Sequence, residues 1–348
     1  MPNAAGAPSA PARAVVGWDI GGVNTKVARV AGGRVLAAHV RPYELQRAPA
    51  ALGDVLRALA ATAGTEATDL HAVTMTAELS QLFRRKRDGV HFVLDAVTAV
   101  LPGAAVRVYT VDGRFLSPGA ARAEPIAVAA SNWAATARLV ARRHPDALLL
   151  DTGTTTTDVV PIVGGALAAC GRTDPERLAS GALVYTGAVR TPTEAIASHV
   201  PLGGALAGVS AEGFALAGDV HVWRGDLAPG DYSVPAPDGR ATTREFAGER
   251  LARIVCADRE LLDDAGVSAI ADALAAAQVA RVVAAIERVR ARHPALREAV
   301  VTGVGAFIGA RAARAAGLDV VWLSESLGED AARCAPAAAV ALLLADVA

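Results

Sequence analysis

Two segments far apart in the sequence place an aspartate, a sharp turn and polar residues directly after an apolar run. The first, DIGGVNTK, spans residues 19–26. Asp19 ends a predicted strand, so its carboxylate is expected at a strand end that faces a cleft. Gly21 and Gly22 let the backbone turn tightly with its N–H groups exposed. Backbone amides and Lys26 suit phosphate oxygens, and Asp19 suits the water shell of a divalent cation.

The second segment, DTGTTTTD, spans residues 151–158 and follows the apolar run 147–150. Its threonines offer hydroxyl groups beside a turn of backbone donors, with Asp151 and Asp158 on either side. Each segment alone could be an ordinary Gly or Thr hairpin with solvated acids. The same unit occurring twice instead favours a paired phosphate site. The candidate phosphate ligands are Gly21, Gly22, Asn24, Thr25, Lys26, Thr152, Gly153, Thr154, Thr155 and Thr156. The candidate metal ligands are Asp19, Asp151 and Asp158, with Mg²⁺ held mainly through waters.

A third segment, VVTGVGAF at residues 300–307, reads as a strand, a glycine turn and the start of a helix. Gly303 and Gly305 would let a nucleoside or another substrate approach the backbone closely. Tight packing between the strand and the helix explains the glycines equally well.

Other candidate site residues lie outside these turns. Glu78 follows the predicted strand 71–75 and is the candidate base that deprotonates an acceptor, making the catalytic set Asp19, Lys26, Glu78 and Asp151. The alternative is a surface glutamate at a helix start. The basic run 84–87 is either a solvated face or a contact for acceptor carboxylates. The candidate substrate-pocket residues in the later, irregular part of the chain are Arg172, Tyr185 and Arg190.

The surrounding pattern predicts an α/β fold of two lobes, each of which begins with a strand–turn–strand unit. We expect a disordered tail over residues 1–13, an N-terminal lobe over 14–123 and a C-terminal lobe over 124–348. Within the second lobe, an irregular insertion is expected at about 171–235. A single helical stretch is predicted over 124–144 at the lobe boundary. A closing helix is predicted over 330–348, which would pack back on the N-terminal lobe.

Composition limits the function classes. The 348 residues carry a formal net charge of −1, which argues against a general nucleic-acid surface. Charged residues interrupt every long apolar run, so no membrane span is expected. The three cysteines, Cys170, Cys256 and Cys334, show no CxxC spacing and predict neither a disulfide framework nor a zinc site. A cytoplasmic location follows as the simplest expectation. The sequence allows a homo-oligomer without specifying one.

The order of first phosphate turn, second phosphate turn and glycine turn resembles the actin-like ATPase superfamily, which has a ribonuclease H-like core and includes sugar kinases and chaperone ATPases. DIGG followed by DTGTTTTDV resembles its hydantoinase/oxoprolinase branch. Longer stretches resemble the tetrahydromethanopterin-linked one-carbon transfer proteins of methylotrophs and the furanylmethanamine synthases of methanofuran biosynthesis. These stretches are GWDIGGVNTK, TMTAELSQLF, GVHFVLDAV, SNWAATARLVAR, DTGTTTTDVVPI, RTDPERLASGALVYTGAVRTP and CADRELLDDA.

The resemblance implies a transferase that joins an (aminomethyl)furanylmethyl diphosphate to the phenol oxygen of a glutamyl tyramine or tyrosine acceptor, with release of diphosphate. It implies Mg²⁺ as cofactor, and ATP that can bind without being consumed. Small-molecule substrates are then the expected partners. An ATP-dependent small-molecule kinase or an oxoprolinase-like hydrolase of the same fold remains the alternative. A non-catalytic nucleotide switch is less favoured, because no long substrate-binding domain or polymer-type insertion is visible.

Overall fold

The computed structural model describes residues 13–169 and 171–348. The predicted tail over 1–13 therefore lies outside the described residues except for Arg13, as does Cys170. Cys256 and Cys334 are both free thiols, the first exposed and the second buried.

The N-terminal lobe is built on a six-stranded sheet. In spatial order its strands are β3 (Arg34–Pro42), β2 (Asn24–Ala31), β1 (Val15–Ile20), β4 (Leu70–Met75), β5 (Ala105–Tyr109) and β6 (Phe115–Leu116). β1 runs antiparallel to β2 and parallel to β4. The helices of this lobe are η1 (Pro49–Ala51), α1 (Leu52–Thr62), η2 (Ala77–Leu79), α2 (Lys86–Val100), α3 (Pro118–Ala123) and α4 (Pro125–Val128). The apolar faces of α1 and α2 cover Trp18 and Ile20 in one core, because alternate strand residues point to the same side of the sheet.

The C-terminal lobe holds the second sheet. Its strands follow the order β10 (Leu183–Val184), β8 (Thr157–Val163), β7 (Ala147–Thr152), β13 (Glu298–Thr302) and β14 (Asp319–Trp322), and β9 (Ala166–Leu167) pairs with β8. Leu148 and Leu150 share a core with α10 (Asp264–Arg290) and α11 (Ala306–Ala315). Leu149 belongs to the core that includes α5 (Asn132–Ala141). Helices therefore cover both faces, as a near-continuous apolar strand requires.

The strand–turn–strand unit occurs once in each lobe, in matching register. Asp19 lies opposite Lys26 in the β1–β2 pair, and Asp151 lies opposite Asp158 in the β7–β8 pair. β1 and β7 each also pair in parallel with a strand on their other side, β4 and β13 respectively. The predicted two-lobed α/β fold is confirmed, with equivalent turns at equivalent places.

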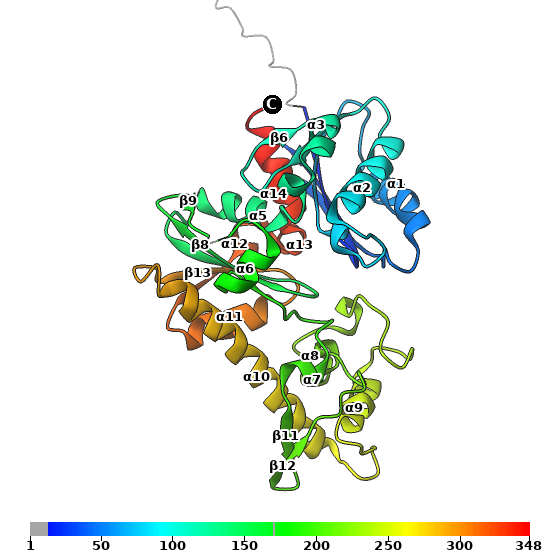
Figure 1. Cartoon of the computed structure of the whole chain (residues 1–348), viewed down its shortest axis with the longest axis vertical. Helices are drawn as coiled ribbons and strands as arrows, with labels where there is room; N and C mark the ends of the chain where they lie inside the picture. The colour runs from blue at the N-terminus through cyan, green and yellow to red at the C-terminus, as the bar shows by residue number, and fades with distance from the viewer. Residues whose placement is uncertain (1–12, 170) are drawn as a thin grey trace, which may run out of the picture.

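The insertion is more ordered than its Gly- and Pro-rich sequence predicts. It contains α6 (Asp174–Ser180), α7 (Thr193–Ile196), β11 (His199–Leu202), β12 (Ala205–Gly208), α8 (Ala217–Arg224) and η3 (Pro229–Asp231). The later of these elements pack with α9 (Arg244–Arg253) around the first half of α10 and form a separate core. Figure 1 shows this small subdomain extending away from both sheets along α10. Most glycines of the insertion lie in its turns and loops. Its composition therefore suggested an irregular segment, although helices and strands connect these turns.

Two predicted helices are broken in the structure. The stretch over 124–144 splits into α4 and α5, because Ala129 forms a bridge to Met75 of β4 and Ala130 takes φ 48°. The closing stretch splits at Cys334 into α13 (Glu329–Arg333) and α14 (Ala335–Ala345), preceded by α12 (Leu323–Leu327). Pro336 accounts for the second break, since proline fits the first turn of a helix and not its interior.

Helix α14 packs across β1, β2 and β4 and against α5. Contact is so close at Gly17 that an added Cβ would lie 1.9 Å from the carbonyl oxygen of Ala337. In Figure 1 the C-terminal helix lies beside the N-terminal sheet. The end of the chain thus joins the two lobes directly.

One helix in the described part of the chain, α10, is long and apolar enough by length and composition to cross a membrane. It packs here against α8, α9 and α11, as the core helix of a folded subdomain does.

Candidate active site

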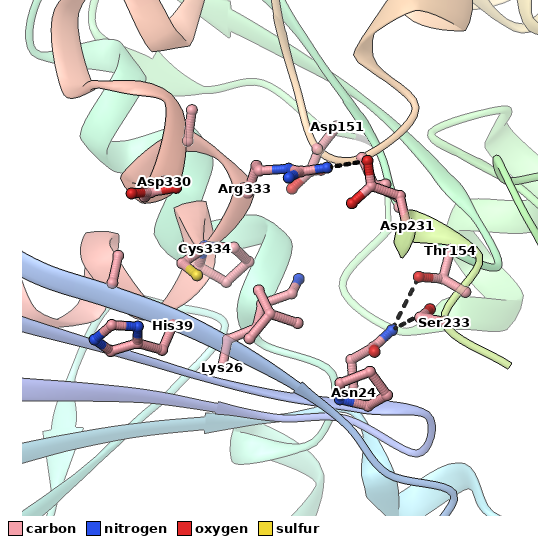
Figure 2. Close-up of a pocket in the computed structure, with 18 of the residues that line it drawn as sticks. Asn24, Lys26, His39, Asp151, Thr154, Asp231, Ser233, Asp330, Arg333 and Cys334 are labelled. Carbon is pink, nitrogen blue, oxygen red and sulfur yellow. Dashed lines mark hydrogen bonds and ion pairs between the residues drawn. The ribbon is translucent and has the colours of Figure 1, made fainter. Parts of the chain in front are cut away.

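The two turns face each other across one cleft. Each turn is closed by the same hydrogen bond: Gly21 N donates to Asn24 O at 3.0 Å, and Gly153 N donates to Thr156 O at 2.9 Å. Asn24 Nδ2 then donates across the cleft to Thr154 Oγ1 at 3.0 Å (Figure 2). The duplicated segments thus meet at a single place between the lobes.

Lys26 provides a positive charge at the cleft between the two turns. Its Nζ lies 3.3 Å from Asp19 Oδ2, the residue opposite it in the β1–β2 ladder. Burial opposes the charged form, but the carboxylates of Asp19 and Asp151 outweigh it and raise the pKa of Lys26 above its ordinary value. Lys26 therefore stays protonated and is available to an anionic ligand.

Two of the three predicted metal-ligand carboxylates suit a cation held through waters. Asp19 is 4 % exposed, and its Oδ1 is buried without a hydrogen-bond partner. Burial raises the pKa of Asp151 to about 7, Asp158 adds to the rise, and Lys26 opposes it. A buried, unpartnered carboxylate oxygen and a carboxyl that resists ionisation are both relieved by a nearby divalent cation.

Asp158 fits this role less well. Its Oδ1 accepts a 2.7 Å hydrogen bond from Arg177, a side chain that is 1 % exposed and stacks on Trp133. Burial raises the pKa of Asp158, and the Arg177 guanidinium works against that rise. Over residues 13–169 and 171–348, no group of three or more His, Cys, Asp or Glu side chains is placed to hold a metal directly.

Two cavities adjoin the paired turns and share Asn24, Lys26 and Thr154 in their walls. The smaller, of about 360 Å³, extends toward Gly303. Figure 2 shows Asp330 and Arg333 of α13 in its wall. The larger, of about 800 Å³, holds Asp19 and Glu78. Polar groups on the turns thus face two compartments, one on each side of the Asn24–Thr154 contact.

Glu78 is buried in the wall of the larger cavity and is not a surface residue. It is 1 % exposed, and neither carboxylate oxygen accepts a hydrogen bond from a side chain of the described residues. Burial raises the pKa of Glu78 to about 7, and Lys86, whose Nζ lies 3.9 Å away, opposes this rise. The reading of a helix-start surface glutamate is therefore wrong. A carboxyl with a pKa near neutrality can accept a proton from a bound acceptor.

The basic run 84–87 divides. Arg84 and Arg87 are exposed, and Arg85 pairs with Asp88 on the surface. Lys86 instead contacts Asp174 of α6 at 2.6 Å. The solvated-face interpretation holds for the arginines and fails for the lysine.

The third turn supports the second one. Gly303 has φ +89°, and an added Cβ there would lie 2.3 Å from Thr152 O and 2.6 Å from Asp151 Oδ1. Gly305 N donates to Thr152 O at 2.8 Å. The tight-packing interpretation is confirmed for Gly303. Gly303 also borders the smaller cavity, and approach of a nucleoside or substrate to its backbone stays a prediction.

The remaining candidates separate into lining and supporting residues. Gly21, Gly22, Asn24, Lys26, Thr154, Thr155 and Thr156 line the larger cavity, and Gly153 lines the smaller one. Thr25 and Thr152 are fully buried and line neither. Tyr185 and Arg190 line the larger cavity, whereas Arg172 points to a separate open depression and lies 3.5 Å from Asp112.

Some residues at the site carried no sequence signal. Asn24 Nδ2 also donates to Ser233 Oγ at 3.2 Å, and Arg333 of α13 pairs with Asp231 at 2.5 Å (Figure 2). These contacts tie the segment after η3 to both lobes. The sequence around residues 231–233 does not resemble a binding motif. These contacts could not be predicted from it, because they depend on how the insertion folds.

The architecture is that of the two-lobed actin-like ATPases, with a phosphate-type turn at the same place in each lobe. Solved structures with this fold include a nucleotide-free acetone carboxylase (TM-score 0.54, 12% identity, 92% of this chain and 70% of that one) and a PilM–PilN type IV pilus biogenesis complex (TM-score 0.50, 13% identity, 96% and 98%). At this identity the likeness concerns the fold alone.

The chain belongs to the hydantoinase/oxoprolinase family, whose model matches residues 69–347. It is 32% identical over 331 residues to the (4-{4-[2-(gamma-L-glutamylamino)ethyl]phenoxymethyl}furan-2-yl)methanamine synthase of Methanocaldococcus jannaschii, covering 95% of this chain and 97% of that protein. It is 29% identical over 202 residues to the protein of the same name from Methanococcus vannielii, covering 57% and 90%. Within the larger family it therefore belongs with the furanylmethanamine synthases of methanofuran biosynthesis, which are enzymes.

Proposed function

We propose that this enzyme forms the aryl ether of a methanofuran-type cofactor by displacing diphosphate from a furanylmethyl diphosphate. The name of the archaeal relative describes a product with a phenoxymethyl ether, a furan methanamine and a γ-glutamyl group. Such an ether is formed when a phenol oxygen attacks the methylene carbon of an (aminomethyl)furanylmethyl diphosphate. The paired turns are the part of this chain suited to the departing diphosphate.

The reaction balances without an oxidant or a nucleotide. A carbon–oxygen bond forms between the phenol oxygen and the methylene carbon, and the bond from that carbon to the diphosphate oxygen breaks with its electron pair. Glu78 takes the phenol proton. The furan ring stabilises positive charge on the methylene carbon, so neutralising the leaving oxygens lowers the barrier most.

Displacement at carbon requires the phenol oxygen, the methylene carbon and the leaving oxygen to lie roughly in line. Glu78 lies in the larger cavity, so the phenol belongs there. The diphosphate then belongs on the far side of the methylene, between the paired turns and toward the smaller cavity, with Lys26 in the wall of both. Tyr185 and Arg190, at the larger cavity, are placed to contact the rest of the acceptor.

Asp19 and Asp151 would hold Mg²⁺ largely through waters, and the ion would neutralise charge on the departing diphosphate. Asp19 Oδ1 lacks any other partner, and Asp151 faces the same cleft as Lys26. Asp158 is better assigned to fixing Arg177 than to metal binding.

The observation that carries the proposal is the meeting of both turns at one cleft beside Glu78, a buried carboxylate to which no described side chain donates a hydrogen bond. The test combines purified protein, the furanylmethyl diphosphate, a γ-glutamyl tyramine or tyrosine acceptor and Mg²⁺, without nucleotide. Ether and free diphosphate are expected in equal amounts, and Glu78→Gln should lower their formation. A strict requirement for ATP hydrolysis would refute the proposal and favour a kinase or an oxoprolinase-like hydrolase, for which Gly303 beside the smaller cavity offers a nucleoside position.

A further inference from the structure

A lysine and an aspartate from different lobes meet beside Glu78. Lys86 lies at the start of α2 in the N-terminal lobe, and Asp174 lies at the start of α6 in the C-terminal lobe. Lys86 Nζ is 2.6 Å from Asp174 Oδ2 and 3.9 Å from Glu78 Oε1. The side chains of Lys86 and Asp174 are 25 % and 17 % exposed, so the pair is partly shielded from water.

Lys86 lies closer to Asp174 than to Glu78, and this difference affects how readily Glu78 accepts a proton. Asp174 holds Lys86 at hydrogen-bond distance, whereas Glu78 accepts no hydrogen bond from a side chain of the described residues. A lysine bonded directly to Glu78 would stabilise its ionised form and weaken it as a base. With Lys86 drawn toward Asp174, Glu78 is left as a buried carboxylate whose proton affinity suits a phenol.

Most other charged groups around Glu78 are engaged by partners, and Arg190, which lines the same cavity, is exposed. On α2, Arg85 pairs with Asp88, and Arg87 is exposed. Across the larger cavity Lys26 pairs with Asp19, Arg177 with Asp158, and Arg47 with Glu44. Among the described residues, Lys86 is the cation that forms an ion pair with Glu78, at 3.9 Å.

We propose that Lys86 and Asp174 are positioning residues for Glu78: Asp174, from the other lobe, holds Lys86 away from Glu78 and leaves the Glu78 carboxylate free to accept the phenol proton. Neither residue touches the reacting atoms. This inference rests on the proposed function, because it assigns the supporting contacts of the same base. It gives the contact between the two lobes at Lys86 and Asp174 a direct effect on the chemistry.

The two partners act on Glu78 in opposite directions. Lys86 lowers the pKa of Glu78 and Asp174 raises it, after the dominant effect of burial. Lys86→Met should therefore move the acid limb of the kcat/KM profile to higher pH by about one unit, and Asp174→Asn should move it to lower pH. A purely structural ion pair would give similar losses at every pH for both variants.

The experiment measures kcat/KM for ether formation from pH 5 to 9 in the wild type, Lys86→Met and Asp174→Asn. Arg87→Met is the matched control, since it removes a cation one residue along α2 that lines neither cavity. The control should keep the wild-type profile. Shifts in the same direction, or none, in the two test variants would overturn the inference.

A titration that does not depend on turnover accompanies the rates. The Glu78 carboxyl is followed by ¹³C NMR in the intact protein and assigned by its loss in Glu78→Gln. Opposite displacements of its titration midpoint in the two variants are expected, and their absence would overturn the inference even if rates change. If the wild type makes no ether from the two substrates, the proposed function fails, while this titration still decides the coupling of Lys86 and Asp174 to Glu78.

Discussion

Charge at single side chains determines what the cleft can bind. Lys26 is the cation shared by both cavities, and Asp19 and Asp151 are the carboxylates that face it. Each aspartate stands at the same register position in its own strand pair, yet the opposite residue is a lysine in one lobe and an aspartate in the other. This difference places one cation between two acids, which suits an anion that arrives with a divalent cation.

Lys26→Met should lower kcat about a hundred- to thousandfold and change the KM of the acceptor little. The reason is that charge on the leaving diphosphate grows toward the transition state, where one lost contact costs about 2.7–4 kcal/mol. Steady-state kinetics with varied acceptor measure both constants. Lys26→Arg keeps the charge and should retain more activity; equal losses in the two variants would mean that the charge is not what matters.

Asp151 should make the metal-free protein less stable as pH rises. Its folded pKa of about 7 lies above the value of about 3.9 for an unfolded aspartate, so the folded state binds more protons between these values. The protonated Asp151 side chain makes its full contribution to the free energy of unfolding below pH 4. This contribution is lost as the pH rises to 7. Asp151→Asn should therefore raise the Tm at pH 8 in EDTA, with a smaller difference as pH falls toward 4.

The Asp151→Asn variant should not catalyse ether formation. Mg²⁺ should raise the Tm of this variant less than it raises the Tm of the wild type. Thermal melts with and without Mg²⁺ provide this comparison. A wild-type advantage at pH 8 in EDTA would show that Asp151 is not strained by burial in the free protein.

At the scale of elements, the second and third turns form one packed unit. The turn after β13 lies against the turn after β7, with Gly303 next to Thr152 and Asp151 and with Gly187 next to the backbone of Thr155. These contacts leave no room for a side chain at Gly303 or at Gly187. The position of the second turn is therefore set by glycines from two other segments.

Gly303→Ala tests this packing against Gly317→Ala. Both glycines have positive φ, so both alanines incur a strain of about 1–2 kcal/mol, but only Gly303 meets atoms within 4 Å. Gly303→Ala should lose more stability and also most of its activity, because Asp151 must move. Chemical denaturation and the ether assay measure these effects. Similar behaviour of the two variants would contradict the packing argument.

At the scale of the whole molecule, the lobes meet at several separate contacts. Asn24 joins Thr154 and Ser233, Lys86 joins Asp174, and α14 of the C-terminal region packs on the N-terminal sheet. Because these contacts lie around the cleft, a ligand that binds between the turns should stabilise both lobes together.

Mg²⁺ and diphosphate together should slow amide hydrogen exchange in residues 19–26 and 151–158 to a similar degree. A ligand that bridges the two turns stabilises both against local opening. Exchange mass spectrometry of the intact protein measures this. Asn24→Ala should weaken the joint protection, and protection confined to one turn would argue against a shared site.

The sequence by itself determined the two-lobed fold and its two strand–turn–strand units, because each turn depends on a few adjacent residues after an apolar strand. Strand, aspartate and glycine follow one another within 19–26 and within 151–158, and local backbone rules suffice to place them. The glycine turn at 303–305 follows the same rules.

Only the tertiary structure decided which charged groups remain free. It buried Glu78, turned Lys86 inward to Asp174, and paired Asp158 with Arg177. It also broke the stretch over 124–144 at Ala130 and ordered the insertion around α10. Each of these outcomes depends on partners distant in the chain, and the cost of burying a charge depends on the partner that it finds.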